Sequence, residues 1–182
     1  MKETIKLGLI LFIITAVSAG VLAISNNLTK DKIAEIAMAG SIEALKEVFG
    51  EENDFKALDE GRLDEIKKAN ESTEEIFEVY SGESLSGYAI KISSKGFGKT
   101  NLITLTGFSL DGNIIGMRLV EHSETEGIGS KATLPDFTDR FQGKNASEEI
   151  TVDTISGATI TSKGVMSGVN EARKVFNEQL SN

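Results

Sequence analysis

The sequence predicts an α+β fold in which one membrane-spanning helix precedes a globular domain built on an antiparallel sheet. Three observations support this fold. Residues 7–24 form an uncharged, mostly apolar run. Between residues 76 and 120, apolar and polar residues alternate in short runs separated by turn residues, as in strands. From Thr161 to Leu180 the apolar residues instead recur at steps of three and four, which indicates a helix.

The composition limits the chemistry that the chain can perform by itself. Its 182 residues are 40% hydrophobic and 26% charged, which suits one globular domain with a small appendage. The formal net charge is -9 and no basic cluster interrupts it, so nucleic acid is not an expected partner. There is no cysteine and one histidine, which excludes iron–sulfur clusters, c-type haem and thiol chemistry within this chain. A redox role would therefore need an organic cofactor.

The apolar run near the N-terminus is long enough to cross a bilayer as a helix. Lys2 and Lys6 precede it, so the positive-inside rule keeps the N-terminus in the cytoplasm and puts the domain outside the cytoplasmic membrane. A cleaved signal peptide is the alternative, because 17–19 and 21–23 offer small residues at cleavage spacing. The run exceeds the usual signal core, which favours a retained single-pass anchor over residues 1–28.

Residues 29–72 are interpreted as a stalk helix and a polar connection. An irregular apolar stripe predicts the helix, namely Ile33, Ile36, Ala37, Ile42, Leu45, Val48 and Phe49. The segment 53–72 is polar and acidic, with weak helical character over 58–69, and is expected to be a loose connection. The folded domain is then predicted to span residues 73–182.

Four strands are predicted in that domain, at 76–80, 87–92, 102–107 and 114–120. Their alternation suggests a sheet with one covered face, and Asp111-Gly112 marks a hairpin turn before the last strand. The segment 96–98 is too short for a dinucleotide fingerprint and is expected to be a turn. Pro135 begins a short helix that carries Phe137 and Phe141 inward.

The stretch Asp-Thr-Ile-Ser-Gly-Ala-Thr-Ile-Thr-Ser at 153–162 is a hydroxyl-rich turn directly before the C-terminal helix. Unpaired N–H groups and the helix dipole favour an anion there, and a phosphate is the usual guest. On spacing alone, a simpler interpretation is favoured. In it Gly157 supplies a turn and the hydroxyls are helix N-caps, the candidates being Ser156, Thr159, Thr161 and Ser162.

The sequence Ser156-Gly157-Ala158-Thr159, with Asp153 three residues ahead, resembles the flavinylation motif of the FMN-binding domain family. That family includes the G subunit of the Rnf electron-transport complex and the C subunit of the sodium-pumping NADH:quinone reductase. The resemblance implies FMN bound covalently through a phosphoester to Thr159. It also implies maturation by an ApbE-type flavin transferase that uses FAD and a metal ion. The remaining cofactor-binding candidates in this stretch are Asp153, Ser156, Gly157, Ala158, Thr161, Ser162 and Lys163.

A second loop carries the resemblance further. His-Ser-Glu-Thr-Glu-Gly-Ile-Gly at 122–129 is similar to the family's Glu-Thr-Pro-Gly-Leu-Gly segment, although Glu126 replaces the Pro and frees the backbone dihedral that Pro would fix. The resemblance makes this loop a wall of the flavin site, with Glu124, Thr125, Gly127, Ile128 and Gly129 as candidates. It adds Tyr88, because Gly-Tyr followed by a Lys-Gly-aromatic-Gly turn is usual in these flavoproteins.

The residue types of this loop suggest two other kinds of site. His122 has no second imidazole or thiolate with which to hold a transition metal, so no metal site is predicted. Glu121, Glu124 and Glu126 read as a solvated acidic edge rather than paired general acids, and weak divalent-cation binding stays open. No catalytic residue is assigned.

Length and motifs make the chain most similar to the Rnf branch of the family. The resemblance implies a membrane-anchored flavoprotein subunit that relays electrons and has no independent catalysis. Its partners would be the other membrane subunits of a complex that couples ferredoxin oxidation and NAD reduction to sodium or proton movement. Two alternatives remain: a pilin-like structural or assembly subunit, although the processed leader pattern is missing, and an extracytoplasmic module that binds a free phosphate-bearing ligand.

Overall fold

The structure is a computed structural model that describes the backbone of residues 2–181 and the side chains of residues 5–26, 29 and 39–181. The chain divides into two compact units, Met1–Gly40 and Ser41–Asn182. A long helix, α1 (Lys2–Phe49), forms the first unit and supplies its last turns to the second.

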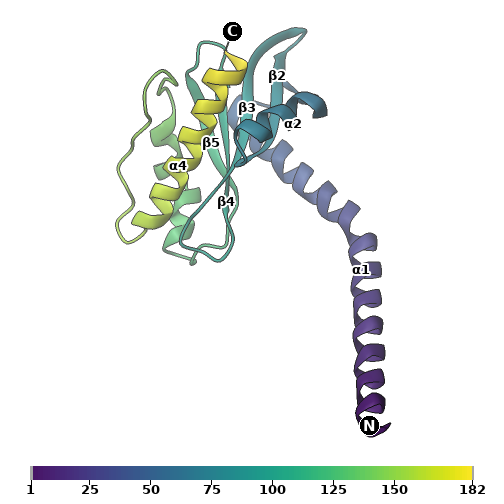
Figure 1. Ribbon diagram of the computed structural model, residues 1–182. Helices are drawn as coiled ribbons and strands as arrows, with labels where there is room; N and C mark the ends of the chain where they lie inside the picture. Colours follow the sequence, from purple (N-terminus) through teal and green to yellow (C-terminus); the bar gives the residue numbers. More distant parts are fainter. Residues whose placement is uncertain (1, 182) are drawn as a thin grey trace. The chain divides into compact units, whose positions relative to one another are not determined.

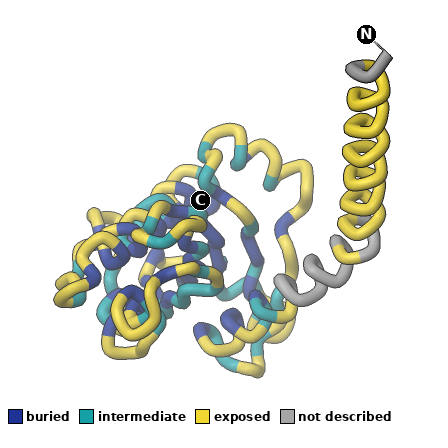
Figure 2. Tube along the Cα trace, turned by 90° about the horizontal axis from the view of Figure 1, so that it is seen from below, coloured by how far each residue is buried: buried dark blue, intermediate teal, exposed yellow. Residues whose placement is uncertain are grey.

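Within the first unit, Ile5–Asn26 is long and apolar enough to cross a membrane, by length and composition. Its side chains are exposed throughout, as the yellow stretch of the tube in Figure 2 shows. This agrees with the predicted span at 7–24. Part of the expected stalk stripe, Ile33, Ile36 and Ala37, lies outside the residues whose side chains are described, and so does Lys2.

The second unit is built on a five-stranded antiparallel sheet whose strands follow one another in chain order (Figure 1). All four predicted strands are confirmed and one is added. Gly112 takes a φ of 77° in the turn between the last two strands, as the predicted hairpin requires. The strands are β1 (Asp54–Ala57), β2 (Thr73–Ser81), β3 (Ser84–Ser94), β4 (Leu102–Ser109) and β5 (Ile114–Glu121).

One face of the sheet is covered by the C-terminal helix α4 (Thr159–Val175) and the π-helical turn that follows it, Phe176–Leu180 (Figure 1). The predicted apolar stripe of this helix is confirmed, because all five of its side chains are buried in the larger core. Phe176 also stacks on Phe108 of β4 at a ring-centroid distance of 4.9 Å. The buried stripe consists of Val165, Val169, Ala172, Phe176 and Leu180.

The other face is covered as well, which corrects the expectation of a single covered face. Leu45 and Val48, from the last turns of α1, pack with Phe77 and Val79 in a second core. Gly107 of β4 lets this helix approach closely, since a Cβ there would lie 2.7 Å from the Val48 side chain. The alternating residues of β2 therefore point into two different cores.

Residues 53–72 are not the loose connection that their polarity suggested. They contain β1 and the helix α2 (Glu60–Ala69), whose first N–H groups donate to the carboxylate of Asp59. Leu58 and Ile66 are buried in the larger core. Two well-placed apolar side chains thus attach an otherwise polar segment, and the compact unit begins at Ser41 rather than at residue 73.

The segment between β5 and α4 contains three short helical elements, η1 (Gly129–Thr133), α3 (Pro135–Thr138) and η2 (Asp139–Phe141). Phe137 and Phe141 are fully buried and meet edge to face at 5.5 Å, as predicted from the Pro135 pattern. These two side chains therefore anchor the segment in the larger core.

The contribution of α2 can be tested with Ile66→Ala. Ile66 is 2% exposed, so the change should lower the free energy of unfolding by about 2–5 kcal/mol through lost burial and a residual cavity. Urea unfolding of the detergent-solubilised chain, followed by far-ultraviolet circular dichroism, measures it. Leu110→Ala, at a site that is 49% exposed, is the control and should change stability by less than about 0.5 kcal/mol. Equal effects would contradict the attachment of α2 to the core.

Candidate functional site

Helix α4 begins at Thr159 without a capping side chain. Ala158 occupies the N-cap position, and no side-chain hydrogen bond caps the helix there. The preceding turn is closed by Gly157 at φ 82° and by the Ala158 N–H donating to the Ile155 carbonyl oxygen at 2.9 Å. The first amide N–H groups of α4 can therefore bind an acceptor from outside the helix. A capping hydroxyl, as in the simple N-cap interpretation, would have used that capacity.

Ser162 shapes this turn from inside the helix. Its buried hydroxyl accepts from the Ile155 N–H at 3.0 Å and donates to the Ala158 carbonyl oxygen at 2.9 Å. Ser162 is thus a support of the turn rather than a cap.

Two glycines on α4 bring its first turns against the sheet and the neighbouring loop. A Cβ on Gly168 would lie 2.5 Å from Oγ1 of Thr104 in β4, and one on Gly164 would overlap the carbonyl oxygen of Lys95. The start of the helix therefore lies close to the end of β3 and the 95–101 loop.

A buried carboxylate joins the segments around the start of α4. Glu124 is 8% exposed, and its Oε1 accepts from the N–H groups of Phe97 at 3.0 Å and Gly98 at 2.8 Å. Its Oε2 accepts from the hydroxyl of Thr161, on the first turn of α4. A Cβ on Gly129 would lie 2.6 Å from the same Oε2, so this glycine is needed for the close fit. One carboxylate thereby holds three segments together, and the expected solvated acidic edge is wrong for Glu124.

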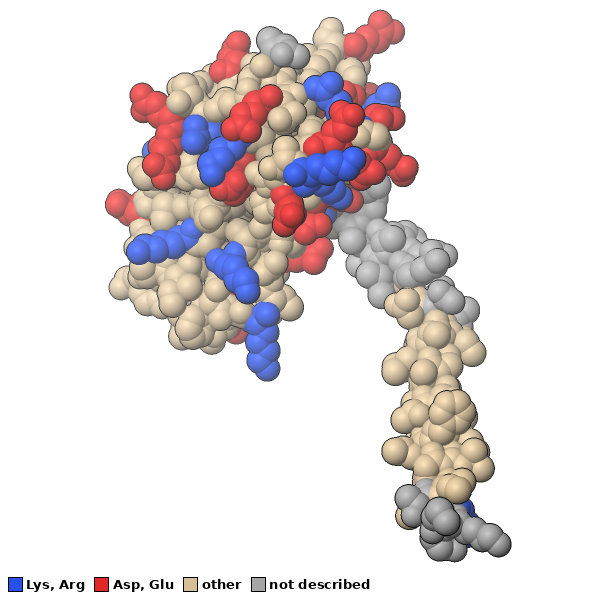
Figure 3. Space-filling model, viewed as in Figure 1, with Lys and Arg blue, Asp and Glu red and all other residues tan. Residues whose placement is uncertain are grey.

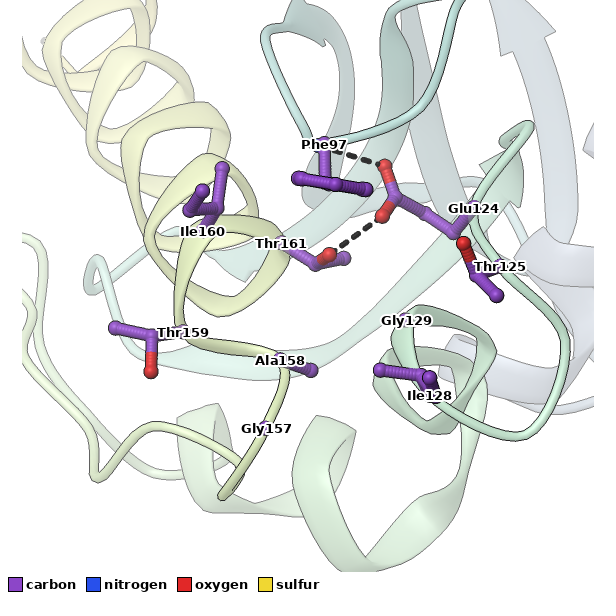
Figure 4. A pocket seen from close by; sticks show the side chains of 10 residues that line it. All are labelled: Phe97, Glu124, Thr125, Ile128, Gly129, Gly157, Ala158, Thr159, Ile160 and Thr161. Carbon is purple, nitrogen blue, oxygen red and sulfur yellow. Dashed lines mark hydrogen bonds between the residues drawn. The ribbon is translucent and has the colours of Figure 1, made fainter.

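A cavity of about 380 Å³ opens between these segments. In Figure 4, Glu124 and Thr161 point toward each other, while Thr159 projects from the first turn of α4 away from Glu124. Thr159 itself is exposed. The lining residues are Phe97, Glu124, Thr125, Ile128, Gly129, Gly157, Ala158, Thr159, Ile160 and Thr161.

Eight of the fourteen cofactor-binding candidates therefore meet at one cavity, although they come from two loops that are far apart in the sequence. Three more support it or lie in its turns: Ser162 as described, Ser156 in the exposed turn before α4, and Gly127, whose N–H donates to the Ser130 hydroxyl at 2.8 Å. The eight are Glu124, Thr125, Ile128, Gly129, Gly157, Ala158, Thr159 and Thr161.

The last three candidates lie apart from the cavity and its turns. Tyr88 lines a different depression and lies edge-on to Phe176 at 6.4 Å. Lys163 lines a groove on another side of α4. The Asp153 carbonyl oxygen accepts from Arg140 at 2.8 Å beside a third depression. These three residues lie outside the cavity because of the direction of their side chains. The spacing of the motif does not predict that direction.

Phe97 and Ile160 line the cavity but were not predicted as site residues. Phe97 could have been found, because it is the aromatic residue of the Lys-Gly-aromatic-Gly turn. Ile160 lies between two predicted residues, and its exposed apolar side chain at a helix start was the available signal. His122 is engaged with the same loop, since its Nδ1 accepts from the Glu124 N–H at 3.3 Å.

Two regions of the chain match known protein families. Residues 96–174 match the FMN-binding domain family, and residues 1–48 match the RnfG N-terminal region. The G subunit of the Na⁺-translocating ferredoxin:NAD⁺ oxidoreductase complex of Acetobacterium woodii is 37% identical over 96% of this chain and 92% of its own length. The chain belongs to the RnfG family. The G subunit of the ion-translocating oxidoreductase complex of Methanosarcina acetivorans is 29% identical over 94% of this chain and 93% of its own length.

The fold has a relative among solved structures. The crystal structure of Shewanella oneidensis NqrC matches with a TM-score of 0.51 at 20% identity, over 69% of this chain and 80% of that one, which supports the α+β assignment. The RnfG match at the N-terminus and the apolar helix Ile5–Asn26 together support single-pass membrane anchoring. The FMN-binding match contains the whole lining of the cavity.

The role of the Glu124 carboxylate can be tested by comparing Glu124→Ala with Glu124→Gln. Alanine leaves two N–H groups and a hydroxyl without their acceptor, so stability should fall by about 1–3 kcal/mol. Glutamine can still accept from both N–H groups with its carbonyl oxygen and donate to Thr161 through its amide, and it should retain most of the wild-type stability. Urea unfolding of both variants distinguishes them. If glutamine costs as much as alanine, the hydrogen-bonded network is not what stabilises the site.

Proposed function

We propose that this RnfG-family chain relays electrons through FMN attached to Thr159, as a subunit of an Rnf-type ferredoxin:NAD oxidoreductase. The complex would couple that electron transfer to sodium or proton translocation. The observation that carries the proposal is the single cavity in which both predicted loops meet at the start of α4, inside the segment that matches the FMN-binding domain family. The Acetobacterium woodii relative is named as a subunit of such a complex, which supports the assignment.

The residues of the cavity suit a flavin mononucleotide. Phe97, Ile128 and Ile160 provide apolar side chains for a flat heteroaromatic ring, and the cavity volume lies in the usual range for small-molecule sites. The uncapped start of α4 offers N–H groups to a phosphate. Bound there, FMN supplies one- or two-electron redox chemistry, which suits a relay between one-electron centres.

Thr159 is placed for attachment but not activated for it. It is exposed at the first position of α4, and among the residues that the structure describes no side chain accepts a hydrogen bond from its hydroxyl. A hydroxyl near neutral pH needs a base before it can attack phosphorus. We therefore assign that role to an ApbE-type transferase with its metal ion.

The attachment reaction balances with FAD as the donor. The Thr159 Oγ forms a bond to the phosphorus nearest the riboflavin, the P–O bond of the pyrophosphate breaks, AMP leaves and the hydroxyl proton passes to the transferase. The remaining phosphodiester carries one negative charge beside the helix N-terminus, where the helix dipole stabilises it.

Covalent attachment can be tested by expressing the chain together with a flavin transferase. Wild type should keep flavin fluorescence in a denaturing gel and gain the mass of one FMN, whereas Thr159→Ala should lose both. Thr154→Ala, at another exposed threonine of the same segment, is the matched control and should be labelled like wild type. Flavin that is released from wild type on denaturation would favour a non-covalent phosphate-bearing ligand. No flavin at all, with a second acceptor labelled in the same cells, would favour a structural subunit.

We further propose that the domain lies outside the cytoplasmic membrane, because Lys2 and Lys6 precede the apolar span. The chain has no cysteine, so single cysteines can report its topology. Ser84→Cys, at the exposed start of β3, should react with a membrane-impermeant maleimide in intact cells, whereas Lys6→Cys should react only after lysis. The opposite pattern would contradict the proposed orientation.

A further inference from the structure

The mouth of the cavity is bordered by an unusual concentration of exposed apolar side chains. Phe97, Ile128, Leu134 and Ile160 are 66%, 50%, 51% and 56% exposed. Among the described residues from Ser41 onward, Leu110 is the one other large apolar side chain with comparable exposure. Three of the four line the cavity, and Leu134 ends the η1 turn that begins at its wall. We call these four residues the apolar rim.

Exposed lysines outnumber exposed carboxylates in the segments that carry the apolar rim, although the protein as a whole is acidic. The three segments that carry the rim, 95–101, 122–134 and 156–162, contain three exposed lysines and one exposed carboxylate, Glu126, because Glu124 is buried. The formal net charge of the chain is -9. The three lysines are Lys95, Lys99 and Lys131, since Lys163 lines a groove on another side of α4.

Figure 3 shows the same separation of charge across the molecule. The lower end of the domain displays Lys or Arg side chains among neutral atoms, whereas most of the carboxylates in this view lie over its upper part. Two carboxylates lie next to these segments in the sequence. Asp136 pairs with Arg140 at 2.9 Å, and Glu121 lines a depression that it shares with Lys91. The rim and its three lysines therefore make up a basic, apolar-centred surface on an acidic domain.

We propose that this surface is the docking site for an acidic, apolar-centred face of another redox-carrying subunit of the same complex. The inference rests on the proposed relay function, which requires a second redox group to come close to the cavity mouth. A central apolar contact ringed by opposite charges is the arrangement that steers and orients protein encounters. A small contact of this kind lies in the size class of weak, electron-transfer interfaces.

An anionic lipid surface would offer the same charge, but it fits the cavity less well. Acyl chains pressed on the rim would cover the mouth without bringing a redox group to it. A protein face can present such a group at the centre of the contact. The observations therefore favour a protein partner, and lipid contact becomes an outcome of the test.

The experiment uses the assembled complex, purified through a tag on this chain, with one cysteine introduced for a benzophenone cross-linker. Leu134→Cys lies on the rim but outside the cavity lining, and Leu110→Cys has the same exposure elsewhere. Illumination should join the Leu134 position to another subunit of the complex, identified by mass spectrometry, while the Leu110 position gives none of that product. Cross-linking to lipid, to a second copy of this chain, or to nothing in an intact complex would overturn the proposal.

Charge reversal tests the electrostatic part. Lys99→Glu with Lys131→Glu should lower the yield of the Leu134 product on the order of tenfold at low salt, and the difference from wild type should shrink at high salt. Lys56→Glu with Lys68→Glu makes the same change of charge at exposed positions outside the surface and should leave the yield unchanged. An equal loss in both pairs would show a general charge effect and overturn the docking assignment.

The two proposals can fail separately. Thr159→Ala removes the attachment point without altering the rim, so the Leu134 product should persist when flavin is absent. If wild type carries no flavin and the product still forms, the docking surface stands without the relay. If flavin is attached and the product is missing, the relay stands and the docking surface is rejected.

Discussion

The carboxylate of Glu124 is the constraint on which the site depends. A buried carboxylate is costly unless its oxygens receive hydrogen bonds, and here they receive them from two backbone N–H groups and one hydroxyl. The three donors belong to two segments of the chain, the loop after β3 and the first turn of α4, while the carboxylate belongs to the loop after β5. The need to satisfy one charged group therefore brings the walls of the cavity together.

Elementary periodicity was sufficient for much of this fold. The four longer strands, the hairpin at Asp111-Gly112 and the buried stripe of α4 each depend on local alternation or three-and-four spacing, and all were predicted. The site could be located because its two loops carry motifs that need no knowledge of tertiary structure. Glu124, Thr125 and Thr159 were found in this way.

Other features could not be predicted because they depend on long-range packing. The helix α2 is polar on most of its surface, and only the burial of Ile66 in a core formed by distant segments attaches it. The second face is covered because Gly107 leaves room for the close approach of α1. A glycine in a predicted strand does not show which element packs against it. Tyr88 and Lys163 belong to the motifs in sequence, but their side chains line depressions other than the cavity.

The glycines at the start of α4 restrict how such a site can diversify. A Cβ on Gly164 would overlap the Lys95 backbone and one on Gly168 would overlap the Thr104 side chain of β4, so a larger residue at either position would push α4 away from these groups. Thr159 would then shift relative to the opposite wall. A chain that retains this packing can change the wall of the cavity through the 95–101 and 125–128 loops, while Thr159 stays in place. Differences in electron affinity among such proteins are therefore expected to come from changes in these two loops rather than in α4.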